Sequence, residues 1–139
     1  MFNSFKRLEK NKALQLSPIT LAFIGDAVHS LFVKEKLVNI CDDKGAVLNK
    51  KASNIVRASA QANFFDEIES LLSDDEIAVY KRARNAKKGT RAKNATVHEY
   101  NKATGFEAVV GYLYLIGEIQ RLESLLNYEK ADNNNENWR

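Results

Sequence analysis

The chain contains a single proline, Pro18, which directly follows Ser17 at the start of a long apolar segment. Serine followed by proline marks a helix start, because the serine oxygen accepts from a free backbone N–H and proline at the first helical position loses no hydrogen bond. Six glycines add few further interruptions in 139 residues. Since no window shows the alternation typical of a strand, we predict an all-α fold.

Apolar residues recur at helical spacing through most of the chain, which predicts helices over 17–37, 46–56, 59–72, 73–86, 96–117 and 118–129. Ser59 is the expected cap of the third helix, and Ser73 with Glu76 and Thr96 with Glu99 form capping boxes at the next two. Gly105 and Gly111 would let another helix approach closely. The expected core residues are Ile19, Leu21, Phe23, Ile24, Val28, Leu31, Phe32, Leu37, Val47, Ile55, Val56, Phe64, Phe65, Ile68, Leu71 and Leu72. The first helix carries apolar residues around most of its circumference, so we expect it to be largely buried.

The length of the chain predicts one domain, which we place at 17–129 between an N-terminal segment, 1–16, and a polar tail, 130–139. No run of eighteen apolar residues and no secretory signal is present, so we expect no membrane span. The single Cys41 cannot form an internal disulfide, which favours a cytoplasmic location.

Positive charge is concentrated in one segment, 81–94, which reads KRARNAKKGTRAKN and holds seven of the 21 basic residues and no acid. The other 14 basic residues are outnumbered by 18 acidic ones, so the positive excess lies in this segment. Such a run is often only a solvated helix end and loop, but seven uncompensated bases favour contact with phosphate. Aromatic residues are not interleaved with them, which favours duplex RNA over single strands. The candidate contacts are Arg82, Arg84, Asn85, Lys87, Lys88, Arg91 and Lys93.

Two isolated carboxylates, Asp26 and Glu107, lie within the two most apolar predicted helices. A buried unpaired carboxylate is costly, so each needs a hydrogen-bonding partner, a basic partner or a metal. One interpretation is a pair of structural acids; the other is a shared divalent cation held through oxygen ligands. His29, His98 and Cys41 do not form a zinc-binding pattern, and there is no Walker loop or G-x-S-x-G motif.

Four short motifs resemble one known family. LAFIGDAV at 21–28 and EAVVGYLYL at 107–115 resemble the two helices that carry the catalytic aspartate and glutamate of the ribonuclease III family. KRARNAK at 81–87 and KATGFEA at 102–108 resemble its Mini-III branch, which has no separate domain for binding double-stranded RNA. The similarity covers about 17–126, in the order of that branch.

The resemblance implies a helical bundle that forms a homodimer and an Mg²⁺-dependent endoribonuclease that leaves 5′-phosphate and 3′-hydroxyl ends on double-stranded RNA. Asp26 and Glu107 would be its catalytic residues and metal ligands. Ala22 and Thr104 occupy places where the wider family carries two further acids. The implied target is the precursor of 23S ribosomal RNA, and no DNA partner is expected.

Two other functions remain open from the residues. The vacated acid positions suit a ribonuclease III-like module that binds structured RNA without cutting it. An all-α protein-interaction domain would explain the basic segment but not Asp26 and Glu107. Retention of both carboxylates favours the enzyme.

Overall fold

The computed structural model describes residues 2, 4–88 and 95–129, and all regular structure within them is helical. The elements are α1 (Lys10–Gln15), α2 (Pro18–Ile40), α3 (Gly45–Val56), α4 (Ala58–Ile68), a short 3₁₀ turn (Glu69–Leu71), α5 (Asp74–Asn85), α6 (Val97–Leu115) and α7 (Ile119–Leu126). The predicted all-α fold is confirmed.

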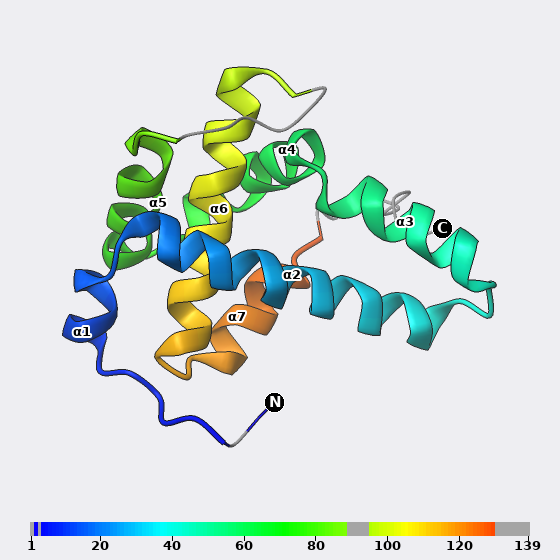
Figure 1. Cartoon of the computed structure of the whole chain (residues 1–139), viewed down its shortest axis with the longest axis horizontal. Coiled ribbons are helices and arrows are strands. Elements are labelled where there is room, and N and C mark those ends of the chain that lie inside the picture. Colours follow the sequence, from blue (N-terminus) through cyan, green and yellow to red (C-terminus); the bar gives the residue numbers. More distant parts are fainter. Residues whose placement is uncertain (1, 3, 89–94, 130–139) are drawn as a thin grey trace.

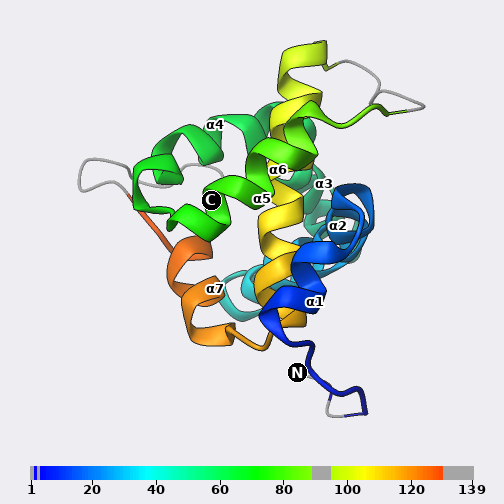
Figure 2. The ribbon, with the colours of Figure 1, turned by 90° about the vertical axis from the view of Figure 1, so that its left-hand side faces the viewer.

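Helix α6 is the central element of the bundle, with α2, α4, α5 and α7 around it (Figures 1 and 2). More than half of its residues are buried, among them Phe106, Val110 and Tyr112. Helix α2 crosses α6, and α3 turns back beside the far half of α2, where Val33, Leu37 and Ala52 form a small second core (Figure 1). The main core therefore surrounds α6, and α6 contacts helices on several of its sides.

The crossing of α2 and α6 depends on two glycines, Gly25 and Gly111. A Cβ atom on Gly25 would overlap the carbonyl oxygen of Glu107, and one on Gly111 would overlap the carbonyl oxygen of Leu21. The two backbones therefore touch directly, as the small residues of α6 predicted. Gly105 serves another contact, since a Cβ there would meet the ring of Tyr80 on α5 at 2.6 Å.

The predicted caps at the starts of α2, α5 and α6 are confirmed. The Ile19 N–H donates to Ser17 Oγ at 3.3 Å, and both capping boxes are complete. The prediction for α4 was wrong, because this helix begins at Ala58 with Arg57 as its cap instead of Ser59. Helix α1 was not predicted. It is held by tertiary contacts, with Ala13 in the main core.

The expectation that α2 is buried on most sides was wrong. Its inner face packs on α6 through residues such as Leu21 and Val28, but Phe23 is 75% exposed, and Ile19 and Leu31 are also exposed. Val47 and Leu71 are exposed as well, contrary to prediction. The first lies on α3, which covers only the end of α2, and the second in the 3₁₀ turn at the surface. No helix in the described part of the chain is long and apolar enough to span a membrane.

Candidate active site

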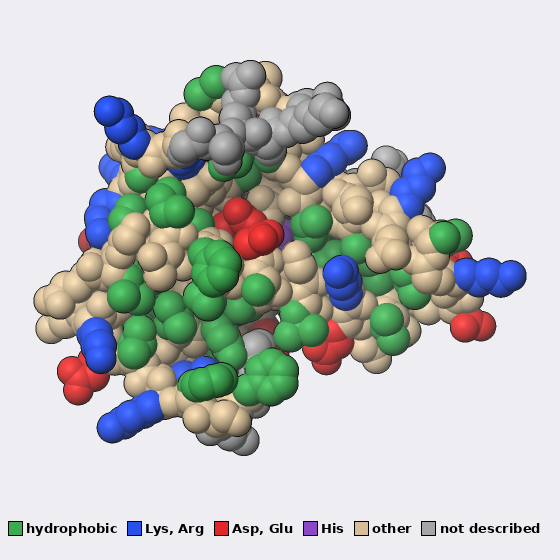
Figure 3. Space-filling model, viewed as in Figure 1, with side chains coloured by type: hydrophobic (Ala, Val, Ile, Leu, Met, Phe, Trp, Pro, Cys, Tyr) green, Lys and Arg blue, Asp and Glu red, His purple; other side chains and the backbone are tan. Residues whose placement is uncertain are grey.

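The crossing of α2 and α6 places Asp26 and Glu107 in one open groove. Gly25 precedes Asp26 and contacts the backbone at Glu107, so the close approach of the two helices fixes the distance between these side chains. The groove is lined by Ile19, Ala22, Phe23, Asp26, Lys87, Lys88, Tyr100, Thr104 and Glu107. Figure 3 shows acidic side chains together in the middle of this face, next to hydrophobic ones.

The two carboxyl groups interact strongly. Burial raises the pKa of Glu107 to about 8, with a hydrogen bond and the charge of Asp26 adding to the effect and a hydrogen bond from Gln61 opposing it. Glu107 is half-buried, whereas Asp26 is exposed at the groove, contrary to the enclosed position expected within an apolar helix. Two carboxyl groups this close favour a proton or a cation between them, which fits a divalent metal ion.

The positions one turn before each acid also lie in the groove. Ala22 contributes only a methyl group, and the Thr104 hydroxyl donates to the backbone oxygen of Tyr100 at 2.9 Å. Among the described residues, no group of three or more histidine, cysteine, aspartate or glutamate side chains could hold a metal. A cation here would have Asp26 and Glu107 as its carboxylate ligands, with oxygens from water or phosphate completing the shell.

The residues predicted to bind RNA, apart from Arg82, divide into three groups. Lys87 and Lys88 line the groove beside the carboxylates. Arg84 lies over the ring of Tyr80, 5.4 Å from its centroid, and donates to the side chain of Asn85 at 3.1 Å. Arg91 and Lys93 lie outside the described residues.

Arg82 has a different environment from the lysines of the groove. Its guanidinium donates to the backbone oxygens of Leu14 at 2.7 Å and Leu16 at 3.2 Å. These bonds attach the end of α1 to α5. Arg82 is exposed but its hydrogen-bonding capacity is partly used within the protein.

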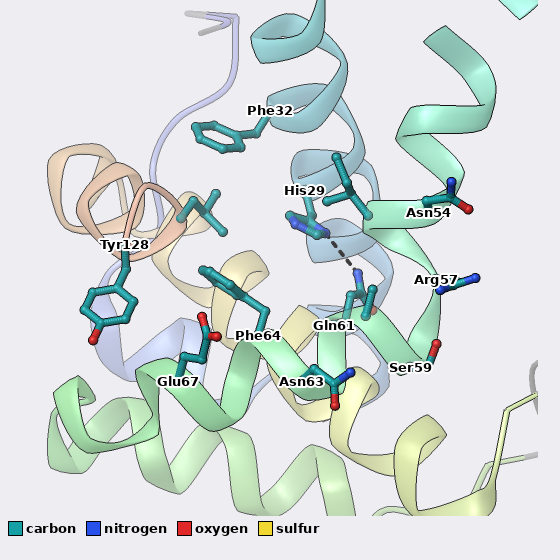
Figure 4. Close-up of a pocket in the computed structure, with 13 residues that line it drawn as sticks. His29, Phe32, Asn54, Arg57, Ser59, Gln61, Asn63, Phe64, Glu67 and Tyr128 are labelled. Atoms are coloured by element: carbon teal, nitrogen blue, oxygen red, sulfur yellow. Dashed lines mark hydrogen bonds between the residues drawn. The ribbon is translucent and has the colours of Figure 1, made fainter. Parts of the chain in front are cut away.

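Two site residues, Gln61 and His29, were missed as a pair by the sequence reasoning. Both are buried, and Gln61 Nε2 lies 2.9 Å from His29 Nδ1 (Figure 4). They line a cavity of about 190 Å³ between α2, α3 and α4, which shares no lining residue with the groove. The one available signal was that Gln61 shares the buried helical face of Phe65 and Ile68.

Comparisons with known proteins agree on one family. The model of the ribonuclease III domain matches residues 19–118. The Mini-ribonuclease 3 of Clostridium tetani is 42% identical over 90% of this chain and 87% of its own length. That of Thermoanaerobacter sp. is 45% identical over 86% of this chain and 84% of its own length. A crystal structure of a Fusobacterium nucleatum protein superposes with a TM-score of 0.75 at 30% identity, covering 81% of this chain and 90% of that one.

Proposed function

The chain belongs to the Mini-ribonuclease 3 branch of the ribonuclease III family and is an endoribonuclease, and on this basis we propose that it cuts double-stranded RNA with Mg²⁺ held by Asp26 and Glu107. The observation that carries the proposal is the pair of mutually interacting carboxyl groups in a groove that two lysines also line. A purely structural pair of acids would be expected to have basic partners inside the fold, but hydrogen bonding and charge link Glu107 to Asp26 and Gln61.

In this proposal the carboxylates of the groove bind the metal and its lysines contact the phosphates. Asp26 and Glu107 would hold the cation, which would balance their negative charge. Lys87 and Lys88 offset the charge of the phosphates on either side of the scissile bond. When bound, Mg²⁺ would neutralise charge on the scissile phosphate and supply an activated water. Attack of that water on phosphorus with the 3′-oxygen as the leaving group would give 5′-phosphate and 3′-hydroxyl ends.

Cleavage of an end-labelled long RNA duplex tests the proposal. The wild-type protein is expected to cut it in Mg²⁺, to stop in excess EDTA and to resume when Mg²⁺ is restored. The same protein should leave a DNA duplex of the same sequence intact. Tight binding of RNA without cleavage in Mg²⁺ would instead support the non-catalytic RNA-binding module.

Lys87 is the residue in the groove best suited to contact phosphate. It is exposed and, within the described residues, its side chain makes no hydrogen bond or ion pair. Lys88 is more constrained, because its ammonium donates to the backbone oxygens of Arg84 at 3.1 Å and Ala86 at 2.8 Å, and burial lowers its pKa. With Arg84, Asn85, Arg91 and Lys93, these lysines form the proposed RNA contact surface.

Lys87→Gln is expected to weaken RNA binding and to reduce the slope of log K against log salt by about one, the loss of one phosphate contact. The measurement is fluorescence anisotropy with a labelled duplex in EDTA at several salt concentrations. Arg82→Gln is the matched control. The guanidinium of Arg82 is bonded to the backbone oxygens of Leu14 and Leu16. This change should therefore lower the melting temperature of the protein and leave the salt slope close to that of wild type. Equal slopes for wild type and Lys87→Gln would contradict the role of Lys87.

We also propose that two copies pair through the exposed apolar face of α2. Phe23, Ile19 and Leu31 lie on this helix at exposures of 75%, 39% and 43%, and the first two also line the groove. A second copy would cover this face and place one active site near each RNA strand. Sedimentation equilibrium should give the mass of two chains, and a single species of 15.7 kDa would contradict the pairing.

The precursor of 23S ribosomal RNA in the cytoplasm is the proposed natural target. The proposed site recognises the form of a duplex and not base edges, so it would act on double-stranded parts of that precursor. Cells without the protein are expected to accumulate 23S ribosomal RNA with unprocessed ends, which primer extension detects. Mature ends in such cells would exclude this target without affecting the proposed chemistry.

A further inference from the structure

A buried glutamine lies directly behind the carboxyl pair. Gln61, on α4, is 3% exposed. Its Nε2 lies 2.9 Å from Nδ1 of His29 on α2 and 3.4 Å from Oε2 of Glu107 on α6. One amide group therefore connects three helices at the back of the groove. Figure 4 shows the first of these contacts, with His29 and Gln61 facing each other.

The chemistry of the three groups determines which way the amide faces. To bind a cation Glu107 must be ionised, and a carboxylate only accepts whereas an amide nitrogen only donates, so Nε2 is the atom that suits Glu107 in its metal-binding form. With the amide reversed, its oxygen would repel the carboxylate. Because Nε2 also faces His29, the histidine Nδ1 accepts and its ring proton lies on the other nitrogen.

The surroundings of His29 support this arrangement. Burial lowers the pKa of His29 to about 4, against the opposing charge of Asp26, so the ring is neutral at neutral pH and its Nδ1 can accept. The ring also packs edge-on against Phe106, with centroids 5.0 Å apart. The acceptor for Gln61 is thus fixed in place by the core.

We propose that Gln61 is a positioning residue, which holds the Glu107 carboxylate toward Asp26 and the groove, and that His29 orients Gln61. The proposal rests on the metal site proposed above. A ligand held in its binding orientation before the metal arrives binds it more tightly, and loss of such a supporting partner typically weakens metal affinity by about 10-fold to 100-fold.

The test is a titration of the protein with Mn²⁺ alone, without RNA, followed by electron paramagnetic resonance. Gln61→Met keeps a similar length but removes both amide hydrogens, and the adjoining cavity of about 190 Å³ leaves room for the side chain. We expect Mn²⁺ affinity about 10-fold to 100-fold below wild type. RNA affinity in EDTA should remain unchanged.

Asn63→Met is the matched control, because Asn63 lies on the same helix, is exposed and makes no side-chain hydrogen bond within the described residues. It should bind Mn²⁺ as wild type does. Glu107→Gln separates the two proposals. If Glu107→Gln loses Mn²⁺ while folded Gln61→Met keeps wild-type affinity, the positioning role is overturned and the metal site stands. If Glu107→Gln binds like wild type, both are overturned.

A second variant covers the case in which Gln61→Met does not fold. His29→Phe preserves a ring against Phe106 but removes the acceptor that orients the amide. We expect His29→Phe to bind Mn²⁺ more weakly than wild type, as Gln61→Met does. Wild-type affinity in a folded His29→Phe protein would overturn the proposal that His29 orients Gln61.

Discussion

Asp26→Asn and Glu107→Gln are each expected to lower the rate of duplex cleavage by at least about 1,000-fold, the rate equivalent of the several kcal/mol of transition-state stabilisation that a metal ion supplies. Each substitution keeps the size of the side chain and removes one of the two carboxylates of the groove. Single-turnover cleavage of a labelled duplex in saturating Mg²⁺ measures the effect. RNA affinity in EDTA should be retained, since neither substitution removes a lysine of the groove.

A matched control is available on the surface of α7. Glu123 is exposed and lies outside the groove, so Glu123→Gln removes the same charge without touching the site. It should cleave like wild type. Cleavage by Asp26→Asn or Glu107→Gln within about tenfold of wild type, which corresponds to only about 1.4 kcal/mol, would contradict their role as metal ligands.

The parts of the fold that could be predicted from the sequence depend on residues that are close together along the chain. Ser17 with Pro18, and the two capping boxes, act within a few residues of themselves, and all three helix starts were confirmed. Helix α1 was missed because six residues are too few to be stable alone. It depends on the burial of Ala13 and on bonds from Arg82, which lies more than sixty residues away.

The same distinction applies to the site. Asp26 and Glu107 were noticeable because each is an isolated acid in an apolar helix. Gln61 was not, since a glutamine in a helix of alanine and phenylalanine is ordinary, and its partners lie 32 and 46 positions away. The exposure of Phe23 was also unpredictable from periodicity, which gives the apolar faces of a helix but not which of them the rest of the chain covers.

Gly25→Ala is expected to destabilise the fold by at least about 3 kcal/mol, the upper part of the usual range for overpacking. For a chain of this size that corresponds to a melting temperature lower by about 10 °C. The added methyl would overlap the carbonyl oxygen of Glu107 and lie 2.9 Å from the backbone nitrogen of Gly111, and neither backbone atom can move without separating α2 from α6. Thermal unfolding followed by circular dichroism measures the change.

Gly45→Ala separates the effect of the crossing from the general effect of replacing a glycine. Gly45 begins α3 and has open space where the new methyl would lie. Alanine is favoured over glycine in helices by up to about 1 kcal/mol, so this variant should be as stable as wild type or slightly more stable. A folded Gly25→Ala protein with wild-type melting temperature would contradict the direct backbone contact. That contact also sets the distance between Asp26 and Glu107. The rate of RNA cleavage should therefore be lower for Gly25→Ala than for wild type even at temperatures at which the variant is folded.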